Sequence, residues 1–281
     1  MQPPIGLIAG GGGLPLLEAR GMRAAGRRIV GVGLRGHFDP ALPDLCDVFK
    51  TAGIVQLGRW IRLLRRYGAV ETVMVGTVRK TRMYDPFRFI RYIPDLRGAQ
   101  LWFMRVRNDR RPDAVLSAVA DEMAQSGITM IDSTQYIGQH MTDPGTLGRV
   151  KPTADQSADM QFALPIIKRM GDLDIGQSIA VRDREVIAVE AIEGTDRMIE
   201  RAGSLCRVGG WTLVKVAKPQ QDMRFDVPTV GPTTIEMLHQ HRAKCLALEA
   251  GKVIMVDREQ MLALADKHGI AVVGIDLAAA D

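Results

Sequence analysis

Short apolar runs alternate with helical stretches along most of the chain, and this alternation restricts the fold more than any other feature of the sequence. Ile5–Ala9, Ile29–Gly33 and Thr72–Val75 have the length and composition of strands, and Pro15–Ala25 and Ile54–Tyr67 between them have the apolar spacing of helices. Strands joined by helices pair in parallel, and the helices cover both faces of the sheet. The first half therefore predicts a Rossmann-like, mostly parallel α/β domain.

The second half continues the alternation but opens with a hairpin. Ser178–Val181 and Val186–Val189 are short apolar runs separated only by Arg182-Asp-Arg-Glu, and this spacing favours antiparallel pairing. Strand and helix patterns then alternate to a last strand at Ala271–Ile275. We therefore expect a second α/β domain with a mixed sheet. A stretch rich in Gly, Pro, Thr and Asp, residues 139–158, indicates a linker or long loop, so the predicted domains are residues 1–137 and 138–281.

The net charge of +5 hides a strongly basic stretch. Residues 59–111 contain 14 Lys/Arg against 4 Asp/Glu, together with 8 of the chain's 14 aromatic residues. Interleaved cations and aromatic rings are typical of contact with an anionic membrane, a lipid or a nucleic acid. They also fit a solvated basic face whose aromatic rings lie in the core or in a subunit contact.

Nothing in the sequence indicates export or a membrane span. No apolar run approaches the length needed to cross a bilayer, and the N-terminus lacks the charged and apolar regions of a secretion signal. Cys46, Cys206 and Cys245 are odd in number and scattered, which gives neither a disulfide framework nor a zinc spacing. We expect a cytoplasmic protein.

A glycine-rich turn, Gly10–Gly13, separates the first strand from the first helix. Such a turn can receive a phosphate through its backbone N–H groups. As a dinucleotide fingerprint it is incomplete, because Leu16 occupies the third glycine position and the second strand ends at Leu34-Arg-Gly without an acid for a ribose. A nucleotide phosphate and a plain tight turn both stay open, and a nucleotide-dependent oxidoreductase is a weaker alternative.

The densest group of charged residues lies between Gly209 and Thr234. An apolar strand, Trp211–Ala217, leads into a loop that prolines keep from becoming a helix. This loop and the end of its strand supply Lys215, Lys218, Asp222, Arg224 and Asp226. A charged loop is often only solvated, but loops at strand ends also carry reacting groups.

A second acidic group follows the hairpin and contains Glu190, Glu193 and Asp196. Thr195 or Asp196 in this group is also suited to cap a short helix, Arg197–Ala202. If these carboxylates meet Asp222 and Asp226, they form an oxygen-rich site of the kind that Mg²⁺ prefers, with cations nearby for phosphates.

Several long motifs resemble one known family. They are Ile5-Gly-Leu-Ile-Ala-Gly-Gly-Gly-Gly-Leu-Pro, Asp174-Ile-Gly-Gln-Ser, Val189-Glu-Ala-Ile-Glu-Gly-Thr-Asp, Lys218-Pro-Gln-Gln-Asp and Arg224-Phe-Asp-Val-Pro-Thr-Val-Gly-Pro-Thr. Together they look like the LpxI-type UDP-2,3-diacylglucosamine pyrophosphatases of lipid A synthesis. The similarity extends over nearly the whole chain.

The resemblance implies Mg²⁺-dependent hydrolysis of a UDP-sugar pyrophosphate, which releases UMP and 2,3-diacylglucosamine 1-phosphate, with water attacking the sugar-side phosphorus. It further implies a glycolipid substrate and no nucleic-acid partner. We expect the basic, aromatic segment to meet the inner membrane surface, where such a substrate resides, and we take a homodimer as the default assembly. The expected catalytic residues are Asp226, Asp222, Lys218 and Arg224; the expected substrate contacts are Gly11, Gly12, Gly13, Leu14, Asn108, Asp109, Gly194, Thr195, Lys215 and Thr229; the expected Mg²⁺ ligands are Asp226, Glu190, Glu193 and Asp196. A non-enzymatic protein that binds lipid or nucleic acid is the other alternative, and it leaves the two acidic groups unexplained.

Overall fold

The contacts of the chain divide it into two compact units. The computed structural model describes residues 2–78, 93–107, 112–225 and 227–277. Unit 1 is Met1–Gly138 together with Asp222–Asp226, and unit 2 is Gln139–Gln221 and Val227–Asp281. The boundary predicted after residue 137 does not anticipate that residues 222–226 also belong to unit 1.

Unit 1 is built on a parallel sheet of five strands in the order β3-β2-β1-β4-β5. Every neighbouring pair in this sheet is parallel. The strands are β1 Ile5–Ala9, β2 Ile29–Leu34, β3 Val48–Ala52, β4 Glu71–Val75 and β5 Thr129–Met130. This arrangement confirms the Rossmann-like first domain, although β3 was not predicted.

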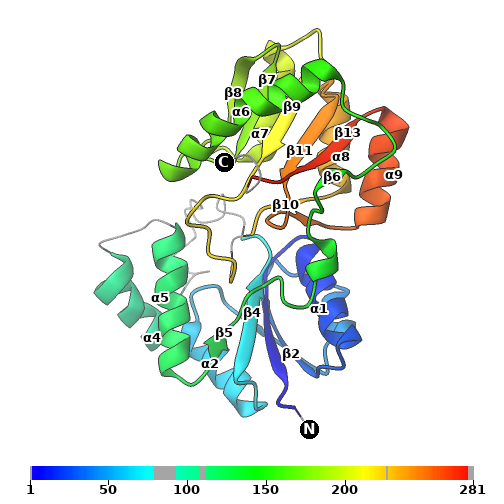
Figure 1. Ribbon diagram of the computed structural model, residues 1–281. Coiled ribbons are helices and arrows are strands. Elements are labelled where there is room, and N and C mark those ends of the chain that lie inside the picture. The colour runs from blue at the N-terminus through cyan, green and yellow to red at the C-terminus, as the bar shows by residue number, and fades with distance from the viewer. Residues whose placement is uncertain (1, 79–92, 108–111, 226, 278–281) are drawn as a thin grey trace. The chain divides into compact units, whose positions relative to one another are not determined.

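Helices cover both faces of this sheet because its strands are apolar on both sides. In Figure 1, α1 (Leu14–Ala24) lies on one side of the strands and α2 (Leu57–Arg66) and α5 (Pro112–Gln125) on the other. Ile5 and Leu7 of β1 are buried in the cluster that contains α1, whereas Ile8 is buried in the cluster of α2 and α5. A 3-10 helix, Leu42–Leu45, completes the α1 layer, and another forms at Gly138–His140.

A further helical element of unit 1 lies between two stretches outside the described residues, 79–92 and 108–111. It consists of α4 (Leu96–Leu101) and a π-helical continuation, Trp102–Val106. Pro86 and Pro94 predict an irregular segment from Arg79 to Gly98, and this prediction is wrong from Leu96 onward. Asp95 caps the helix there by accepting a hydrogen bond from the backbone N–H of Gly98 at 2.9 Å.

Unit 2 has a mixed sheet of six strands in the order β6-β13-β11-β9-β7-β8. The strands are β6 Gly145–Thr146, β7 Ser178–Arg182, β8 Glu185–Val189, β9 Thr212–Lys215, β11 Cys245–Glu249 and β13 Ala271–Ile275. The pairs β9–β11 and β11–β13 are parallel, and β7, β8 and β6 add antiparallel edges. The mixed sheet and the hairpin are therefore confirmed. A separate parallel pair joins β10 (Thr229–Val230) to β12 (Ile254–Met255).

Alternate residues of the central strand β11 enter different cores. Cys245 and Ala247 pack with α6 (Ala154–Asp172), whereas Leu246 and Leu248 pack with the helices of the opposite layer. Those helices are α7 Thr195–Leu205, α8 Pro232–Gln240 and α9 Arg258–His268. Both faces of the sheet are therefore buried by helices. Side chains that contact a ligand are expected at the ends of its strands instead.

The linker predicted at residues 139–158 is wrong in its second part. β6 pairs with β13, and α6 begins at Ala154. Thr153 and Gln156 form a capping box, in which the Gln156 backbone N–H donates to Thr153 Oγ1 at 3.2 Å and the Thr153 backbone N–H donates to Gln156 Oε1 at 2.9 Å.

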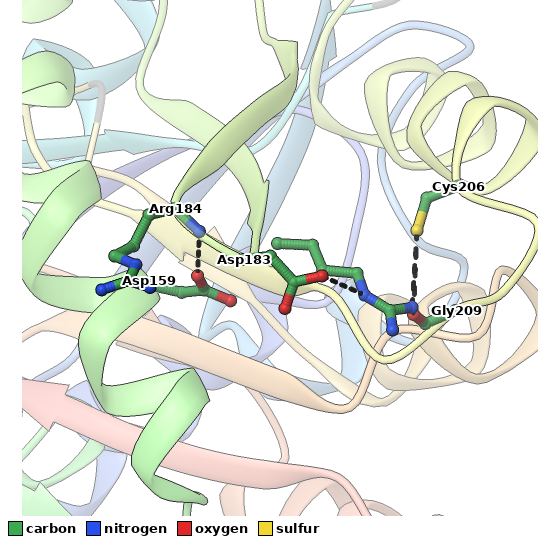
Figure 2. A network of polar contacts seen from close by, with 6 residues as sticks. Asp159, Asp183, Arg184, Cys206 and Gly209 are labelled. Carbon is green, nitrogen blue, oxygen red and sulfur yellow. Dashed lines mark hydrogen bonds and ion pairs between the residues drawn. The ribbon is translucent and has the colours of Figure 1, made fainter.

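A buried acid fixes the hairpin of unit 2 to α6. Asp183 and Arg184, between β7 and β8, have φ angles of 53° and 60°, as a tight hairpin turn requires. Asp159 of α6 accepts a hydrogen bond from the Arg184 backbone N–H at 2.7 Å, as Figure 2 shows. The hairpin is therefore set against the helix through a carboxylate that is almost fully buried.

None of the helices in the described part of the chain combines the length and apolar character that crossing a bilayer requires. Cys46, Cys206 and Cys245 are free thiols, as their scattered positions predict.

Candidate phosphate-binding site

A polar pocket of about 230 Å³ opens in unit 2 where two helices begin and one strand ends. It is lined by Glu193, Gly194, Thr195, Asp196, Lys215, Thr229 and Thr234. Glu193 precedes α7, Gly194 is its N-cap, and Thr195 and Asp196 are its first two residues. The other three come from the end of β9 (Lys215), the start of β10 (Thr229) and the first turn of α8 (Thr234). The pocket therefore unites residues that the sequence distributes over two separate motifs.

Lys215 provides a buried ammonium group in the wall of this pocket. Its side chain is almost entirely buried, and Nζ donates to Thr195 Oγ1 and to the Thr229 carbonyl oxygen, each at 3.2 Å. Thr195 Oγ1 donates in turn to Glu190 Oε1 at 3.1 Å. Burial of an ammonium group is costly unless hydrogen bonds and negative charge offset it, and this chain of contacts supplies both.

The starts of α7 and α8 add partial positive charge to the pocket. Gly194 is the N-cap of α7, with a φ of 84°, and no side chain caps that helix. Thr195 and Asp196 therefore lie inside the first turn, so the expectation that one of them caps the helix is wrong. At the start of α8, the Gly231 backbone N–H donates to Thr234 Oγ1 at 3.4 Å. Helix N-termini attract anions because their first N–H groups have no partners within the helix.

The acids near the pocket differ in what they contact. Glu193 pairs with Arg201 of α7, and its own backbone N–H and this arginine lower the pKa of the Glu193 carboxyl. Glu190 is buried, and its Oε2 has no hydrogen-bond partner among the described residues. An orphaned carboxylate oxygen beside a polar pocket is suited to contact a cation. In the described part of the chain, no three His, Cys, Asp or Glu side chains are close enough to form a metal site.

Lys218 lies outside the pocket lining. Its ammonium group pairs with Asp174, which follows α6. The loop is further held where Pro219 Cδ lies 2.8 Å from the position that a Cβ on Gly171 would occupy. A further contact is the Ala217 backbone N–H, which donates to Glu249 Oε2 at 2.8 Å; burial raises the pKa of Glu249. The ion pair between Lys218 and Asp174 thus gives both motifs a structural role, because it joins the loop after β9 to the segment after α6.

The segment Asp222–Phe225 belongs to unit 1. Arg224 donates from Nε to Asp222 Oδ1 at 3.0 Å and from Nη2 to Asp222 Oδ2 at 2.6 Å, and this bidentate pair lowers the pKa of Asp222. The backbone N–H and the hydroxyl of Ser133 both donate to the Met223 carbonyl oxygen, at 3.0 and 2.8 Å. Asp226, which follows, lies outside the described residues, as do Asn108 and Asp109.

The glycine-rich turn of unit 1 is held mainly by its own backbone. The Gly10 N–H donates to the Val75 carbonyl oxygen at 2.8 Å, and Gly11 and Thr77 exchange two hydrogen bonds of 2.9 Å. A Cβ on Gly10 would lie 2.8 Å from the Thr77 carbonyl oxygen, which explains the need for glycine there. Gly12, Gly13 and Leu14 remain at the uncapped start of α1 as candidates for phosphate contact. Backbone packing thus accounts for the glycine-rich turn, on which the alternative of a nucleotide-dependent oxidoreductase depended.

Sequence reasoning missed two residues of this region. Thr234 lines the pocket, and the Gly231-Pro232 helix start two residues before it is the signal that could have found it. Asp174 was noted only within a motif, and its pairing with Lys218 is a contact over 44 residues that no local pattern contains.

The fold and this pocket define a two-domain α/β protein with a polar pocket at the starts of two helices, which is suited to bind an anion. The chain belongs to the LpxI family: the model of the LpxI N-terminal domain matches residues 4–140, and the model of the LpxI C-terminal domain matches residues 143–273. The UDP-2,3-diacylglucosamine pyrophosphatase LpxI of Caulobacter vibrioides is 35% identical in an alignment of 284 positions that covers 97% of this chain and 97% of the relative.

Solved structures give only distant likenesses. A biotin carboxylase domain of a thermophilic 2-oxoglutarate carboxylase has 10% identity and a TM-score of 0.27, and the biotin carboxylase subunit of a pyruvate carboxylase has 12% and 0.28. These matches cover 64% and 74% of this chain, which spans only 35% and 42% of theirs. At these values we infer neither a shared fold nor a shared function.

Proposed function

We propose that this protein hydrolyses UDP-2,3-diacylglucosamine to UMP and 2,3-diacylglucosamine 1-phosphate. The similarity to the Caulobacter enzyme supports the substrate and the reaction. The observation that carries the proposal within this chain is the pocket in which the Lys215 ammonium group, the Thr195 hydroxyl and two helix N-termini converge. A pyrophosphate requires this kind of positive, hydrogen-bonding environment.

In this proposal the described residues bind and orient the phosphates. Lys215 offsets charge on a phosphate oxygen, and the Thr195 hydroxyl fixes the position of its ammonium group while Glu190 holds that hydroxyl. The N–H groups at the start of α7 provide further donors to the phosphate. Lys218 and Arg224, which are paired with Asp174 and Asp222, position the loop that carries Asp226.

Asp226 is the proposed essential carboxylate, as a Mg²⁺ ligand or as the group that orients the attacking water. Glu190 fits a cation through its orphaned Oε2, and Glu193 and Asp196 line the pocket as the other proposed ligands. These three acids do not form a metal site by themselves, so the proposal depends on Asp226. Bound Mg²⁺ would neutralise phosphate charge and so ease attack on phosphorus. Gly11, Gly12, Gly13, Leu14, Asn108, Asp109, Gly194 and Thr229 remain proposed substrate contacts.

Attack at the sugar-side phosphorus breaks the bond from that phosphorus to the bridging oxygen. The water oxygen then enters 2,3-diacylglucosamine 1-phosphate, and UMP leaves with the bridging oxygen. Because the substrate carries two acyl chains, the proposal includes peripheral contact with a membrane. A homodimer is the symmetric assembly that we propose by default, and light scattering of the purified chain tests it.

The test is incubation of the purified full chain with UDP-2,3-diacylglucosamine in detergent micelles and ¹⁸O-labelled water, with Mg²⁺ and then with EDTA. We expect Mg²⁺-dependent UMP, with the label in the sugar phosphate. A folded, Mg²⁺-supplied sample that forms no UMP would overturn the activity, and label in UMP would overturn the proposed point of attack.

A further inference from the structure

Exposed apolar side chains of unit 1 concentrate on one helical element. Among the described residues, five of the twelve exposed large apolar side chains lie within residues 93–104. Phe103 is 66% exposed and Met104 is 78% exposed. We call the group the apolar patch; it consists of Ile93, Leu96, Trp102, Phe103 and Met104.

The same element directs charged side chains toward the domain. Arg105 donates to Asp121 Oδ2 of α5 at 2.7 Å, and Arg97 donates to Glu122 Oε1 at 3.4 Å and also to Ser126. A surface helix of a globular protein ordinarily buries its apolar side chains and exposes its charged ones. Here two arginines pair with acids of α5 while large apolar side chains remain exposed. Packing within unit 1 therefore does not explain the apolar patch.

Hydrogen bonds and close packing hold the element that carries the apolar patch against the rest of unit 1. Asp95 Oδ2 accepts from the Arg59 backbone N–H at 2.8 Å, in addition to the bond through which Asp95 caps α4. A Cβ on Gly98 would lie 2.2 Å from the Val55 carbonyl oxygen, so the first turn of α4 packs directly on the segment before α2. Val106 is buried, and Leu101 packs against the cluster of α2 and α5. These contacts set the exposed side chains in place before any partner arrives.

Cations accompany the patch. Arg97 and Arg105 are paired with acids of α5, but α2, against which α4 packs, contains no acid. Its four arginines are Arg59, Arg62, Arg65 and Arg66. Apolar side chains accompanied by arginines match a lipid bilayer with anionic headgroups, because the apolar groups enter the acyl boundary while the cations meet phosphates.

Two other partners of the apolar patch, a second copy of this chain and a nucleic acid, fit these side chains less well. Two copies that met symmetrically through this surface would place like-charged arginines close together. A nucleic acid would use the cations and the aromatic rings, but Leu96 and Met104 offer it no ring on which to stack.

We propose that the apolar patch and the neighbouring arginines bind this protein to anionic membranes, with Phe103 and Met104 inserted at the boundary between headgroups and acyl chains. This inference assigns the membrane contact of the proposed function to named side chains of unit 1. It rests on the geometry of unit 1, and vesicles free of substrate test it separately from hydrolysis.

Trp102 provides a built-in reporter. The chain has three tryptophans, and Trp60 and Trp211 are buried at 4% and 0% exposure, whereas Trp102 is 44% exposed. With vesicles of equal parts phosphatidylglycerol and phosphatidylcholine at low salt, we expect co-sedimentation and a blue shift of tryptophan emission. Both effects should weaken at high salt and with pure phosphatidylcholine. Trp102→Phe should bind but lose the blue shift.

The variant that tests the patch is Phe103→Ser with Met104→Ser, which should weaken vesicle binding at least about tenfold. Its control is Leu205→Ser with Val208→Ser, which removes two exposed apolar side chains of unit 2 and should bind like the wild type. Should the patch variant fail to fold, the emission shift of the wild type and its loss in Trp102→Phe still decide the matter.

Three results would overturn the proposal: no sedimentation with anionic vesicles, sedimentation that leaves Trp102 emission unchanged, or equal binding by the patch variant. A patch variant that dissociates a dimer while the wild type ignores vesicles would assign the surface to self-association instead. Hydrolysis measured in detergent micelles does not depend on any of these outcomes, so the two proposals can fail separately.

Discussion

Lys215 Nζ and Thr195 Oγ1 lie 3.2 Å apart and join the end of β9 to the start of α7. The contact is local to unit 2, yet it connects two motifs twenty residues apart in the sequence. Because the threonine hydroxyl also donates to Glu190, its oxygen faces the lysine as an acceptor. The contact thus orients the ammonium group in the pocket.

Replacement of Lys215 by Met should remove the phosphate contact and retain most of the buried volume. We expect kcat/KM to fall by about 100-fold or more, because charge that stabilises a reacting phosphate is lost. The measurement is UMP formation in micelles, with a thermal melt to show that the variant is folded. Lys252→Met, at an exposed lysine of unit 2, is the control and should retain activity. Near-normal turnover by Lys215→Met would contradict the proposed role.

Thr195→Val removes only the hydroxyl and preserves the shape of the side chain. It leaves Lys215 and Glu190 without their shared partner, so we expect a drop in kcat/KM of roughly tenfold and a loss of stability of about 1–3 kcal/mol. Thr195→Ser keeps a hydroxyl and should restore most of the activity. If valine and serine behave alike in kinetics and in thermal melts, the hydroxyl does not position the lysine.

Asp226→Ala should leave the fold intact and remove most turnover. We expect a loss of about 100-fold or more if this carboxylate holds Mg²⁺ or orients water. Asp172→Ala, at an exposed position at the end of α6, is the matched control. EDTA should abolish the wild-type rate and change the residual rate of the variant little; a variant that stays active and sensitive to EDTA would show that the essential carboxylate lies elsewhere.

Glu18 should make the stability of the protein depend on pH. Its side chain in α1 is fully buried, neither carboxyl oxygen has a hydrogen-bond partner among the described residues, and burial, followed by the charge of Asp132, raises the pKa of Glu18 from 4.5 to about 8. Between these values the folded state keeps a proton that the unfolded state has released. The contribution of Glu18 therefore weakens folding as pH rises from about 4.5 to about 8.

The test of this dependence is urea unfolding of Glu18→Gln and the wild type across the pH range. Glutamine stays neutral, so the variant should gain stability relative to the wild type as pH rises, by an amount on the order of a few kcal/mol at pH 8. Glu185→Gln, at an exposed position of β8, should follow the wild type. A difference between Glu18→Gln and the wild type that does not vary with pH would show that Glu18 ionises normally in the fold.

The sequence predicted the fold best where strands and helices alternate with clear turn residues. β1, α1 and β2 follow one another with glycine turns between them, and the final strand β13 matches its predicted range. The pattern failed at β11, the central strand of unit 2, because Cys-Leu-Ala-Leu-Glu is short, apolar and equally compatible with a helix. β3 was missed for a related reason: only Ala52 of its five residues is buried, so its apolar pattern is weak.

Sequence reasoning found the parts of the pocket but not their grouping. Lys215, Thr195, Gly194 and Thr229 were all expected as substrate contacts, and the structure brings them together around one cavity. Lys218 was expected beside them, but its partner is Asp174. Side-chain pairing over such distances depends on how α6 meets the loop after β9, and local composition carries no information on that packing.

Asp222–Asp226 belongs to unit 1, although the residues before and after it belong to unit 2. The coding sequence of the first unit is therefore discontinuous, and a stop codon after residue 138 would not yield that unit complete. A fragment of this kind would lack the acceptor for Ser133 that Met223 provides and the ring of Phe225, which packs against the core of α2 and α5. The chain passes from unit 2 into unit 1 and back within a few residues, so any truncation that separates the two halves also removes from unit 1 the segment that ends in Asp226.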